Sequence, residues 1–323
     1  MEPERVTASP PAGGHRALAR AISAAERDDP PVGVLAARPP GTGSPARLVG
    51  LTGPPGSGKS TLADALVTAW RGDRLTVAVL AVDPSSPYTG GALLGDRVRM
   101  QGHATDPGVF IRSMGARGHL GGLAAATRSA VRLLEGDGFD RILVETVGVG
   151  QSELEVSAVA DTVVVVTTPA SGDGIQVLKA GVMEAGDVFV VNKADLAGAD
   201  RTVHEIRAMV RGGARPDGWA APVLATVATC GQGLDDLRGA LDRHHAHLVA
   251  SVDLRRRRED RLVEEIVTLV ARRAAGAARR MVAAEGLPLR DREREADASV
   301  DPVRIAERLL ARLGLAPPAG QEG

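Results

Sequence analysis

Short apolar runs alternate along the chain with longer segments in which apolar residues recur every three or four positions. Each run is rich in valine, leucine or isoleucine, and its length suits a single β-strand. Strands that are apolar throughout and alternate with helices are typical of a parallel sheet covered by helices on both faces. The pattern therefore predicts an α/β fold with a mostly parallel central sheet flanked by helices. The predicted strands are residues 47–53, 76–84, 109–114, 141–148, 161–169, 187–195 and 222–228.

The segments between these runs predict the covering helices, which are residues 15–27, 60–70, 120–135, 176–185, 201–211 and 234–247. After residue 250 the strand pattern stops. A long amphipathic helix over residues 252–285 and a short one over 301–313 follow. We therefore divide the chain into residues 1–45, a disordered N-terminus and a helical arm, residues 46–250, the sheet domain, and residues 251–323, a helical C-terminal extension.

Composition narrows the class of protein. The chain has 323 residues and a net charge of −1, so it lacks the strong positive field of a dedicated nucleic-acid binder. Its single cysteine cannot form an intrachain disulfide, which suits a reducing cytoplasm. No apolar run approaches the roughly 18 residues of a membrane-spanning helix, and the N-terminus has no apolar signal-peptide core. We expect a cytoplasmic protein that binds neither nucleic acid nor membranes.

Residues 53–60, with the sequence GPPGSGKS, fit the pattern G-x-x-x-x-G-K-[ST] and are called the phosphate loop below. They stand between an apolar run and a predicted helix, which is the context of a nucleotide-binding P-loop. Backbone N–H groups of such a loop surround phosphate oxygens, while Lys59 reaches the β- and γ-phosphates and the Ser60 hydroxyl ligates Mg²⁺. The predicted nucleotide-binding residues here are Gly53, Pro54, Pro55, Gly56, Ser57, Gly58, Lys59, Ser60 and Thr61.

Residues 192–195, with the sequence NKAD, end the sixth run and are called the guanine loop. In GTPases an N-K-x-D loop reads guanine. Asp195 would accept hydrogen bonds from the ring N1–H and the exocyclic amine, a donor pair that adenine lacks. The stem of Lys193 would pack over the base plane. We therefore predict Asn192, Lys193 and Asp195 as base-binding residues, with GTP and GDP as the ligands.

Three carboxylates between these loops are candidates for binding Mg²⁺ and for switching: Asp83, Asp96 and Glu145. Glu145 follows a buried strand, where an acid needs a partner, and the N–H of Gly148 can meet a γ-phosphate. A turn cap at Asp83 and a solvated loop acid at Asp96 stay open as alternatives. With Lys59, the residues Asp96, Glu145 and Gly148 form the predicted catalytic set. Val149 directly follows Gly148 where Ras-like enzymes have glutamine, so slow intrinsic hydrolysis is expected.

Together these motifs resemble one family, the methylmalonyl-CoA mutase-associated GTPases (the MeaB/ArgK type) of the SIMIBI class of P-loop proteins. The similar strings are GPPGSGKSTL (53–62), VDPSSPYTGGALLGDRVRM (82–100), FIRSMGARGHLGGLA (110–124), VETVGVGQSE (144–153), IQVLKAGVMEAGD (175–187) and VNKADL (191–196). The resemblance covers nearly the whole chain, and its most family-specific strings are VETVGVGQSE and TGGALLGDR.

The resemblance implies a slow GTPase that acts as a chaperone of an adenosylcobalamin-dependent acyl-CoA mutase, gating cofactor loading and protecting or reactivating the mutase. Methylmalonyl-CoA mutase is the first candidate client, and isobutyryl-, ethylmalonyl- or hydroxyisobutyryl-CoA mutase would serve equally well. The resemblance also implies that residues 46–250 form the P-loop GTPase domain. It further implies a homodimer formed through the helical extension, residues 251–323.

One departure from the family pattern lies in the second base-reading loop. The family's Ser-Ala-x-x-Gly-x-Gly appears here as residues 227–233, VATCGQG, so Val227 replaces the serine. The N–H of Ala228 can still meet guanine O6, and Ala228 is therefore included among the predicted nucleotide-binding residues.

Two other functions remain as alternatives. A nickel-delivery GTPase would need Cys or His ligands near a switch. Cys230 stands alone, and His244, His245 and His247 are expected to form a solvated cluster on a helix. An ATP-dependent kinase of a transport protein is disfavoured by Asp195, which adenine would leave without a partner.

Overall fold

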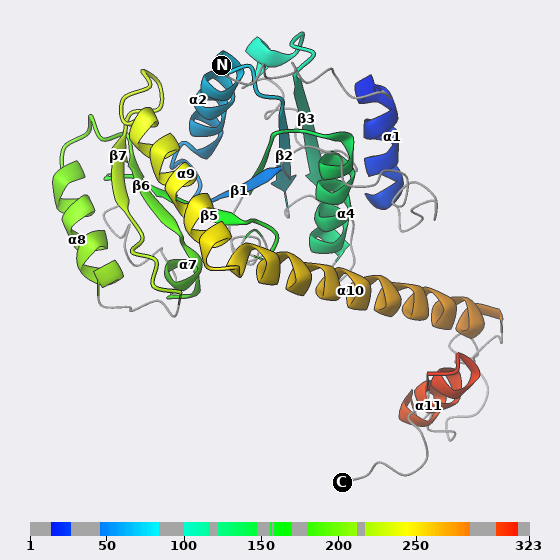
Figure 1. The fold of residues 1–323 in the computed structure, drawn as a ribbon. Coiled ribbons are helices and arrows are strands. Elements are labelled where there is room, and N and C mark those ends of the chain that lie inside the picture. The colour runs from blue at the N-terminus through cyan, green and yellow to red at the C-terminus, as the bar shows by residue number, and fades with distance from the viewer. Residues whose placement is uncertain are drawn as a thin grey trace, which may run out of the picture. The chain divides into compact units, whose positions relative to one another are not determined.

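The computed structural model describes residues 14–26, 46–83, 100–115, 122–146, 156, 158–169, 180–211, 217–284 and 302–315. The chain divides into two compact units, residues 1–262 and 263–323. The first unit contains the sheet and the helices that pack on it (Figure 1).

A parallel sheet of seven strands forms the centre of the first unit. The strands are β1 (Arg47–Thr52), β2 (Val77–Asp83), β3 (Val109–Gly115), β4 (Arg141–Thr146), β5 (Thr162–Thr167), β6 (Val188–Asn192) and β7 (Val223–Thr226). The predicted α/β fold is confirmed, and every pairing in the described sheet is parallel. The strand order is β3-β2-β4-β1-β5-β6-β7, so β2, β3 and β4 lie on one side of β1, and β5, β6 and β7 lie on the other. Ligands of such sheets bind at this switch point, outside the carboxyl ends of the strands.

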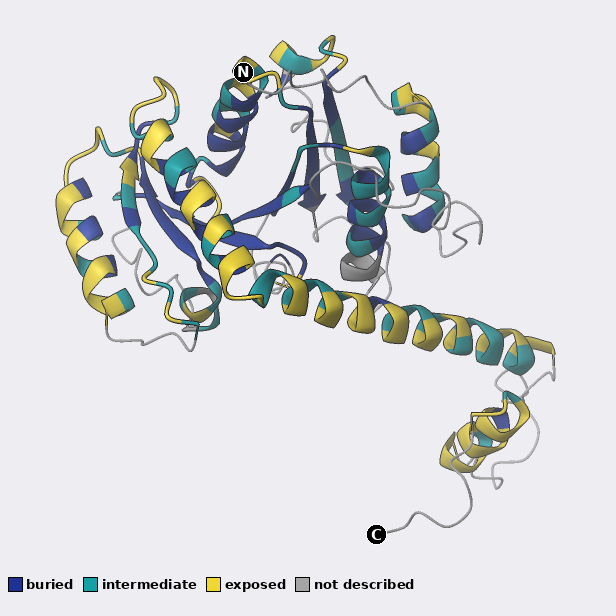
Figure 2. Cartoon of the chain, viewed as in Figure 1, coloured by how far each residue is buried: buried dark blue, intermediate teal, exposed yellow. Residues whose placement is uncertain are grey.

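Alternate residues of the central strands enter two separate core clusters. In β1, Leu48 packs into one cluster and Val49 into the other, and in β5 the same holds for Val163 and Val164. Because both faces of the sheet are covered, the sequences of the strands are continuous apolar runs and do not alternate between apolar and polar residues. Figure 2 shows the central strands almost wholly buried, while the outward faces of the helices are exposed.

Helices cover both faces of the sheet. One core cluster contains residues of α2 (Lys59–Gly72) and α9 (Leu234–Ala250). The other contains residues of α1 (Gly14–Glu26), α4 (Gly122–Asp137) and α8 (Ala199–Arg211), with α7 (Ala180–Ala185) packed against it, and a 3-10 helix η1 spans Gln101–His103. The predicted helices are found with ends shifted by a few residues, and positions 176–179 lie outside the described residues. In α1, the side chains of Leu18 and Ile22 are buried within the first cluster.

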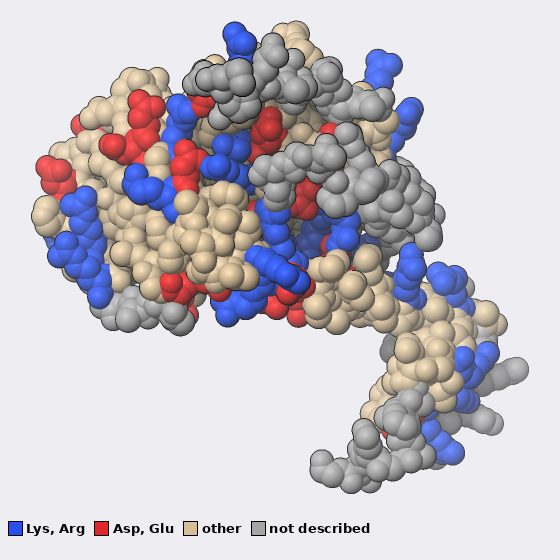
Figure 3. All heavy atoms as spheres, viewed as in Figure 1, with Lys and Arg blue, Asp and Glu red and all other residues tan. Residues whose placement is uncertain are grey.

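Helix α10 (Asp253–Ala284) begins in the first unit and continues into the second, which also contains α11 (Pro302–Arg312). In the second unit, Val263, Ile266, Val267 and Val270 of α10 are each more than half exposed. Within the described residues, none of the helices combines the length and the apolar character needed to cross a membrane. On the face drawn in Figure 3, basic and acidic side chains of the described residues are interspersed.

Candidate nucleotide-binding site

Two glycines of the phosphate loop stand where any side chain would collide with the neighbouring strands. Gly53 has a φ of 135°, and a Cβ there would lie 2.0 Å from the carbonyl oxygen of Val166 in β5. Gly58 has a φ of 88°, and its Cβ would lie 2.3 Å from Nδ2 of Asn192 in β6. Glycine adopts positive φ without steric cost. The loop therefore lies close against β5 and β6, and α2 begins directly after it.

The side chain of Lys59 is folded back onto the phosphate loop. Its Nζ donates hydrogen bonds to the carbonyl oxygens of Gly53 (2.8 Å) and Pro54 (3.0 Å), and the residue is only 6% exposed. A buried ammonium requires hydrogen-bond acceptors of this kind. The two carbonyl groups thus hold a positive charge within the loop that the sequence assigns to phosphate.

Ser60 and Glu145 meet across the boundary between α2 and β4. The Ser60 hydroxyl donates to Oε1 of Glu145 at 2.5 Å, and both residues are buried. Parallel pairing of β1 and β4 places Leu51 opposite Glu145, so this carboxylate stands at the end of the sheet from which the phosphate loop leaves. A hydroxyl and a carboxylate are oxygen ligands of the type that Mg²⁺ prefers.

Asn192 connects three segments that are distant in sequence. Its Nδ2 donates to the carbonyl oxygen of Ser57 in the phosphate loop at 2.9 Å. Its Oδ1 accepts from the Thr226 hydroxyl at 3.1 Å and from the Ala228 N–H at 3.2 Å. Asn192 is 2% exposed, so these bonds form in a dry setting where an unpaired amide would be costly. Asn192 therefore links the phosphate loop to the end of β7 and to the residue pair that follows it.

Lys193 and Asp195 are both exposed, next to the buried Asn192. Lys193 has a φ of 57°, and its carbonyl oxygen accepts from the Leu196 N–H at 3.0 Å, which closes a turn. The Ala194 N–H donates to the carbonyl oxygen of Thr226 at 3.0 Å and ties this turn to β7. The guanine loop is therefore a fixed turn with two side chains available to solvent.

Other residues predicted for the site are described only in part. Asp83 is the last residue of β2, two strands from β1, and its backbone pairs with Gly115. Asp96 and Gly148 lie outside the described residues. In the phosphate loop and the turn after it, Pro55, Gly56 and Thr61 are exposed and Pro54 is buried.

Three aspartates that no sequence motif indicated stand directly before β4, β5 and β6, at the end of the sheet opposite the phosphate loop. Each carboxylate accepts a hydrogen bond from a backbone N–H at or near the start of another strand: Thr76 N to Asp140 (2.7 Å), Leu48 N to Asp161 (3.3 Å) and Val163 N to Asp187 (2.8 Å). The sequence does contain a signal for them, an aspartate immediately ahead of an apolar run in FDRILV, ADTVVV and GDVFVV.

The expectation of a solvated histidine cluster on α9 is wrong for His244. This residue is fully buried, with Nδ1 2.9 Å from the Thr162 hydroxyl and Nε2 3.4 Å from Oδ1 of Asp187. The ring of Trp219 lies beside it, with 4.8 Å between ring centroids. Among the described residues, no group of three His, Cys, Asp or Glu side chains is arranged to hold a metal ion. His244 therefore belongs to the packing between α9 and β5.

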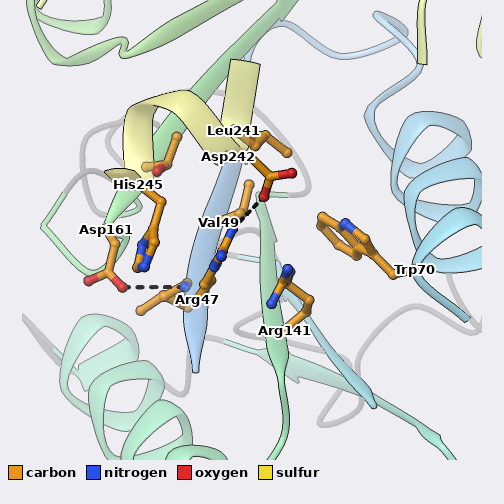
Figure 4. Close-up of a pocket in the computed structure, with 10 residues that line it drawn as sticks. Arg47, Val49, Trp70, Arg141, Asp161, Leu241, Asp242 and His245 are labelled. Carbon is orange, nitrogen blue, oxygen red and sulfur yellow. Dashed lines mark hydrogen bonds and ion pairs between the residues drawn. The ribbon is translucent and has the colours of Figure 1, made fainter. Parts of the chain in front are cut away.

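A small pocket lies at the amino-terminal ends of β1 and β4 (Figure 4). Arg47 in this pocket pairs with Asp242 of α9, and Arg141 stands nearby. Burial, and next the Arg47 guanidinium, lower the pKa of Arg141 and also that of His245. None of the residues predicted to bind nucleotide lines the pocket. We assign it to the packing of α9 on the sheet.

The family model described as "Methylmalonyl Co-A mutase-associated GTPase MeaB" matches residues 18–283 of this chain, a range that includes the phosphate loop and the guanine loop. The chain belongs to this family. The resemblance drawn from the sequence motifs is confirmed, and this MeaB-family member is a P-loop GTPase that binds guanine nucleotide.

Individual relatives agree with the family match. A protein of Pyrococcus abyssi (strain GE5 / Orsay) named as a GTPase is 50% identical over 268 residues, which are 82% of this chain and 82% of the relative. The GTPase ArgK of Escherichia coli (strain K12) is 39% identical over 231 residues, 70% of this chain and 69% of that protein. The crystal structure of LAO/AO transport system kinase has a TM-score of 0.62 and 24% identity, covers 93% of this chain and 98% of its own, and is similar in fold.

Proposed function

We propose that this chain is a GTP-hydrolysing chaperone of an adenosylcobalamin-dependent acyl-CoA mutase, with methylmalonyl-CoA mutase as its client. The observation that carries the proposal is the match of residues 18–283 to a family described as mutase-associated GTPases. The phosphate loop and the guanine loop supply the nucleotide site that such a role requires. The chaperone gates cofactor loading and protects or reactivates the mutase in the cytoplasm.

In this proposal the phosphate loop binds the phosphates of GTP. Lys59 is already held at the loop by two carbonyl oxygens and can turn its donors to phosphate oxygens. Lys193 and Asp195 are exposed and read the base, while Asn192 fixes the guanine loop against the phosphate loop. Ala228 lies next to this set through its bond to Asn192.

We propose that Ser60 and Glu145 hold Mg²⁺, with Asp83 and Asp96 as further carboxylates of the metal and switch region. The 2.5 Å separation of the Ser60 hydroxyl and the Glu145 carboxylate supports this, because two hard oxygen ligands already converge beside the phosphate loop. A bound Mg²⁺ neutralises charge on the β- and γ-phosphates. Gly148 completes the proposed catalytic set as a backbone donor to the γ-phosphate.

We also propose that the chain acts as a homodimer through its helical extension. Val263, Ile266, Val267 and Val270 of α10 recur at helical spacing, and all four are exposed. A stripe of apolar side chains on one helix face is the usual form of a helix–helix contact. Sedimentation of the purified chain at several concentrations tests this point, and a monomer at micromolar concentration would contradict it.

The two alternative functions predict different ligands. A transport-system kinase would use ATP, so competition of GTP, GDP and ATP for the purified chain separates it from the GTPase proposal. A nickel-delivery protein would bind nickel ions in the absence of nucleotide. Among the described residues, no group of three or more His, Cys, Asp or Glu side chains is arranged to hold a metal ion, so these residues give the nickel-delivery function no support.

The decisive experiment reconstitutes the mutase with adenosylcobalamin, with and without this chain and GTP. We expect that the chain with GTP raises cofactor loading and prolongs mutase activity during turnover. The Lys59→Ala variant should bind no nucleotide and should give no GTP response, whereas Arg201→Ala, an exposed change on α8, should behave as the unmodified chain. Equal mutase activity and cofactor content with and without the chain would contradict the chaperone role.

A further inference from the structure

Two arginines occupy the same register position at the amino-terminal ends of β1 and β4. Arg47 and Arg141 begin these strands and are direct partners in the parallel pairing. Side chains of paired residues point to the same face of a sheet, and neighbouring strands lie about 4.8 Å apart. Both arginines line the pocket where α9 packs on the sheet, and Figure 4 shows their side chains next to each other. Like charges at paired positions of neighbouring strands repel, so this arrangement requires compensation.

The carboxylate of Asp242 on α9 compensates Arg47 but not Arg141. Arg141 is half-buried, and its Nη1 donates to the backbone carbonyl oxygen of Asp140 at 3.1 Å. The carboxylate of Asp140 instead accepts from the N–H and the hydroxyl of Thr76, at 2.7 and 2.8 Å. Within the part of the chain that the structure describes, Arg141 forms no ion pair. Charges removed from water are normally paired, so the guanidinium of Arg141 lacks the partner that its position calls for.

Asp161, the other carboxylate that lines the pocket, is engaged by α10. Its Oδ2 lies 2.6 Å from Nη2 of Arg258, and its Oδ1 lies 2.9 Å from Nη2 of Arg261. The Leu48 N–H also donates to Oδ2 at 3.3 Å, and Arg261 donates in addition to the carbonyl oxygen of Val159. Two guanidinium groups therefore neutralise Asp161, which leaves none of its charge to compensate Arg141.

The space between the groups that line the pocket is small. It is about the size of one water molecule, which excludes a nucleotide or a coenzyme but admits a single small ion. The buried side chains of Trp70 and Leu241 form apolar walls of this space. Apolar surroundings lower the local dielectric constant and so strengthen the attraction between a guanidinium group and an anion.

We propose that this pocket binds a small inorganic anion such as chloride between the guanidinium groups of Arg47 and Arg141. A guanidinium group offers N–H donors and no acceptor, so two of them converging on one space are suited to an anion. The anion offsets the repulsion between the two arginines and completes the packing of α9 on the sheet. This anion pocket is separate from the nucleotide site, because none of the residues predicted to bind nucleotide lines it.

His245 of α9 also lines the pocket and responds to the charge within it. Burial, and next the Arg47 guanidinium, lower the pKa of the His245 imidazole. Arg258 and Arg141 lower it further, whereas Asp161 opposes them. A bound anion counteracts the three arginines, so it raises the pKa of His245 and binds more tightly when the ring is protonated. Anion affinity should therefore increase as pH falls through the pKa of His245.

The first test measures thermal unfolding of the full chain in sodium chloride and in sodium gluconate at equal ionic strength, because gluconate is too large for the pocket. We expect the Tm difference, chloride minus gluconate, to be roughly 2–4 °C greater in the parent chain than in Arg141→Ala. The matched control is Arg243→Ala, which removes an exposed arginine from α9 and should keep the difference of the parent chain. The same Tm difference in the parent chain and in Arg141→Ala, or an equal loss in Arg243→Ala, would overturn the proposal.

Two measurements on the parent chain keep the proposal testable if Arg141→Ala does not fold. Crystals soaked in sodium bromide should show anomalous scattering from bromide between the guanidinium groups of Arg47 and Arg141. In an NMR titration, chloride should raise the pKa of His245 relative to gluconate and leave the titration of exposed His204 on α8 unchanged. A pocket without bromide, or a His245 titration that is the same in both salts, would contradict the proposal.

Discussion

The hydroxyl of Ser60 donates a 2.5 Å hydrogen bond to the carboxylate of Glu145, although 85 positions separate the two residues in sequence. A hydroxyl–carboxylate bond of this length is charge-assisted. Both residues are buried, so the bond lies out of competition with bulk water. It joins the start of α2 to the end of β4 at the point where phosphate and metal are expected.

Removing the negative charge of Glu145 should weaken the binding of Mg²⁺ at this site. In Glu145→Gln the amide keeps the size of the side chain but is a poorer ligand for a hard cation, so we expect hydrolysis to fall roughly 100-fold and half-maximal activity to need more Mg²⁺. A Mg²⁺ titration of GTP hydrolysis measures both. The control is Glu205→Gln on α8, where the side chain pairs with exposed Arg201. An unaltered Mg²⁺ titration for Glu145→Gln would remove Glu145 from the metal site.

A methyl group at position 58 should disable the phosphate loop. Gly58→Ala places Cβ 2.3 Å from Nδ2 of Asn192 at a φ of 88°, so both the backbone and the guanine loop must shift. We expect at least roughly tenfold weaker binding of a fluorescent GDP analogue. Gly72→Ala at the end of α2 is the matched control, because a Cβ there meets no atom within 4 Å. Equal affinities for the two variants would show that the loop tolerates the methyl group.

Base selection should depend on the charge of Asp195. Asp195→Asn replaces one acceptor oxygen by a donor, so the contact with the N1–H and exocyclic amine of guanine is lost and xanthine becomes a better match. We expect GTP affinity to fall and xanthosine triphosphate affinity to rise, with stability unaltered because Asp195 is exposed. Competition binding with GTP, XTP and ATP measures the change, and Asp200→Asn on α8 is the control. Full GTP preference in Asp195→Asn would contradict the base-reading assignment.

Asn192 should contribute to stability as well as to binding. Asn192→Ala leaves the Ser57 carbonyl oxygen and the Ala228 N–H without their bonds to the amide. Unpaired buried groups cost about 1–3 kcal/mol each, so loss of the two bonds should lower the free energy of unfolding by roughly 2–6 kcal/mol. Urea unfolding with and without GDP measures the loss, and GDP should restore less stability than in the parent chain. A variant as stable as the parent would show that water replaces the amide.

The pair of Arg71 and Asp106 should make stability depend on acid pH. The Arg71 guanidinium, bonded to Asp106 through two nitrogens at 2.8 and 2.9 Å, lowers the pKa of Asp106 below its ordinary value of 3.8. A lowered folded-state pKa contributes stability that is present above the unfolded value and is lost as pH falls through the folded one. Asp106→Asn should therefore be less stable than the parent at neutral pH. The difference in unfolding free energy, measured by urea titration across acid pH, should vanish below the folded-state pKa, and a constant difference would contradict the linkage.

Element type could be predicted from the sequence because strand and helix patterns are local. All seven predicted strands are present in the sheet, and the long helix predicted over residues 252–285 spans Asp253–Ala284. The seventh strand ends at Thr226, two residues before the predicted end, because Val227 turns away and its N–H donates to the carbonyl oxygen of Gln232. This hydrogen bond depends on the conformation of the loop, so the apolar periodicity of the sequence does not predict it.

The sequence by itself determined the fold class, because apolar runs and helical periodicity are local patterns. It also predicted the phosphate loop and the guanine loop, since each is a short string whose chemistry follows from its own residues. Only the tertiary structure decided that Asn192 binds the Ser57 carbonyl across 135 positions, that His244 is buried, and that Arg261 binds Val159 and Asp161. The reason is physical. Hydrogen bonds between distant segments depend on strand order and helix placement. The residue type of an arginine or asparagine does not show whether its side chain faces solvent or a buried partner.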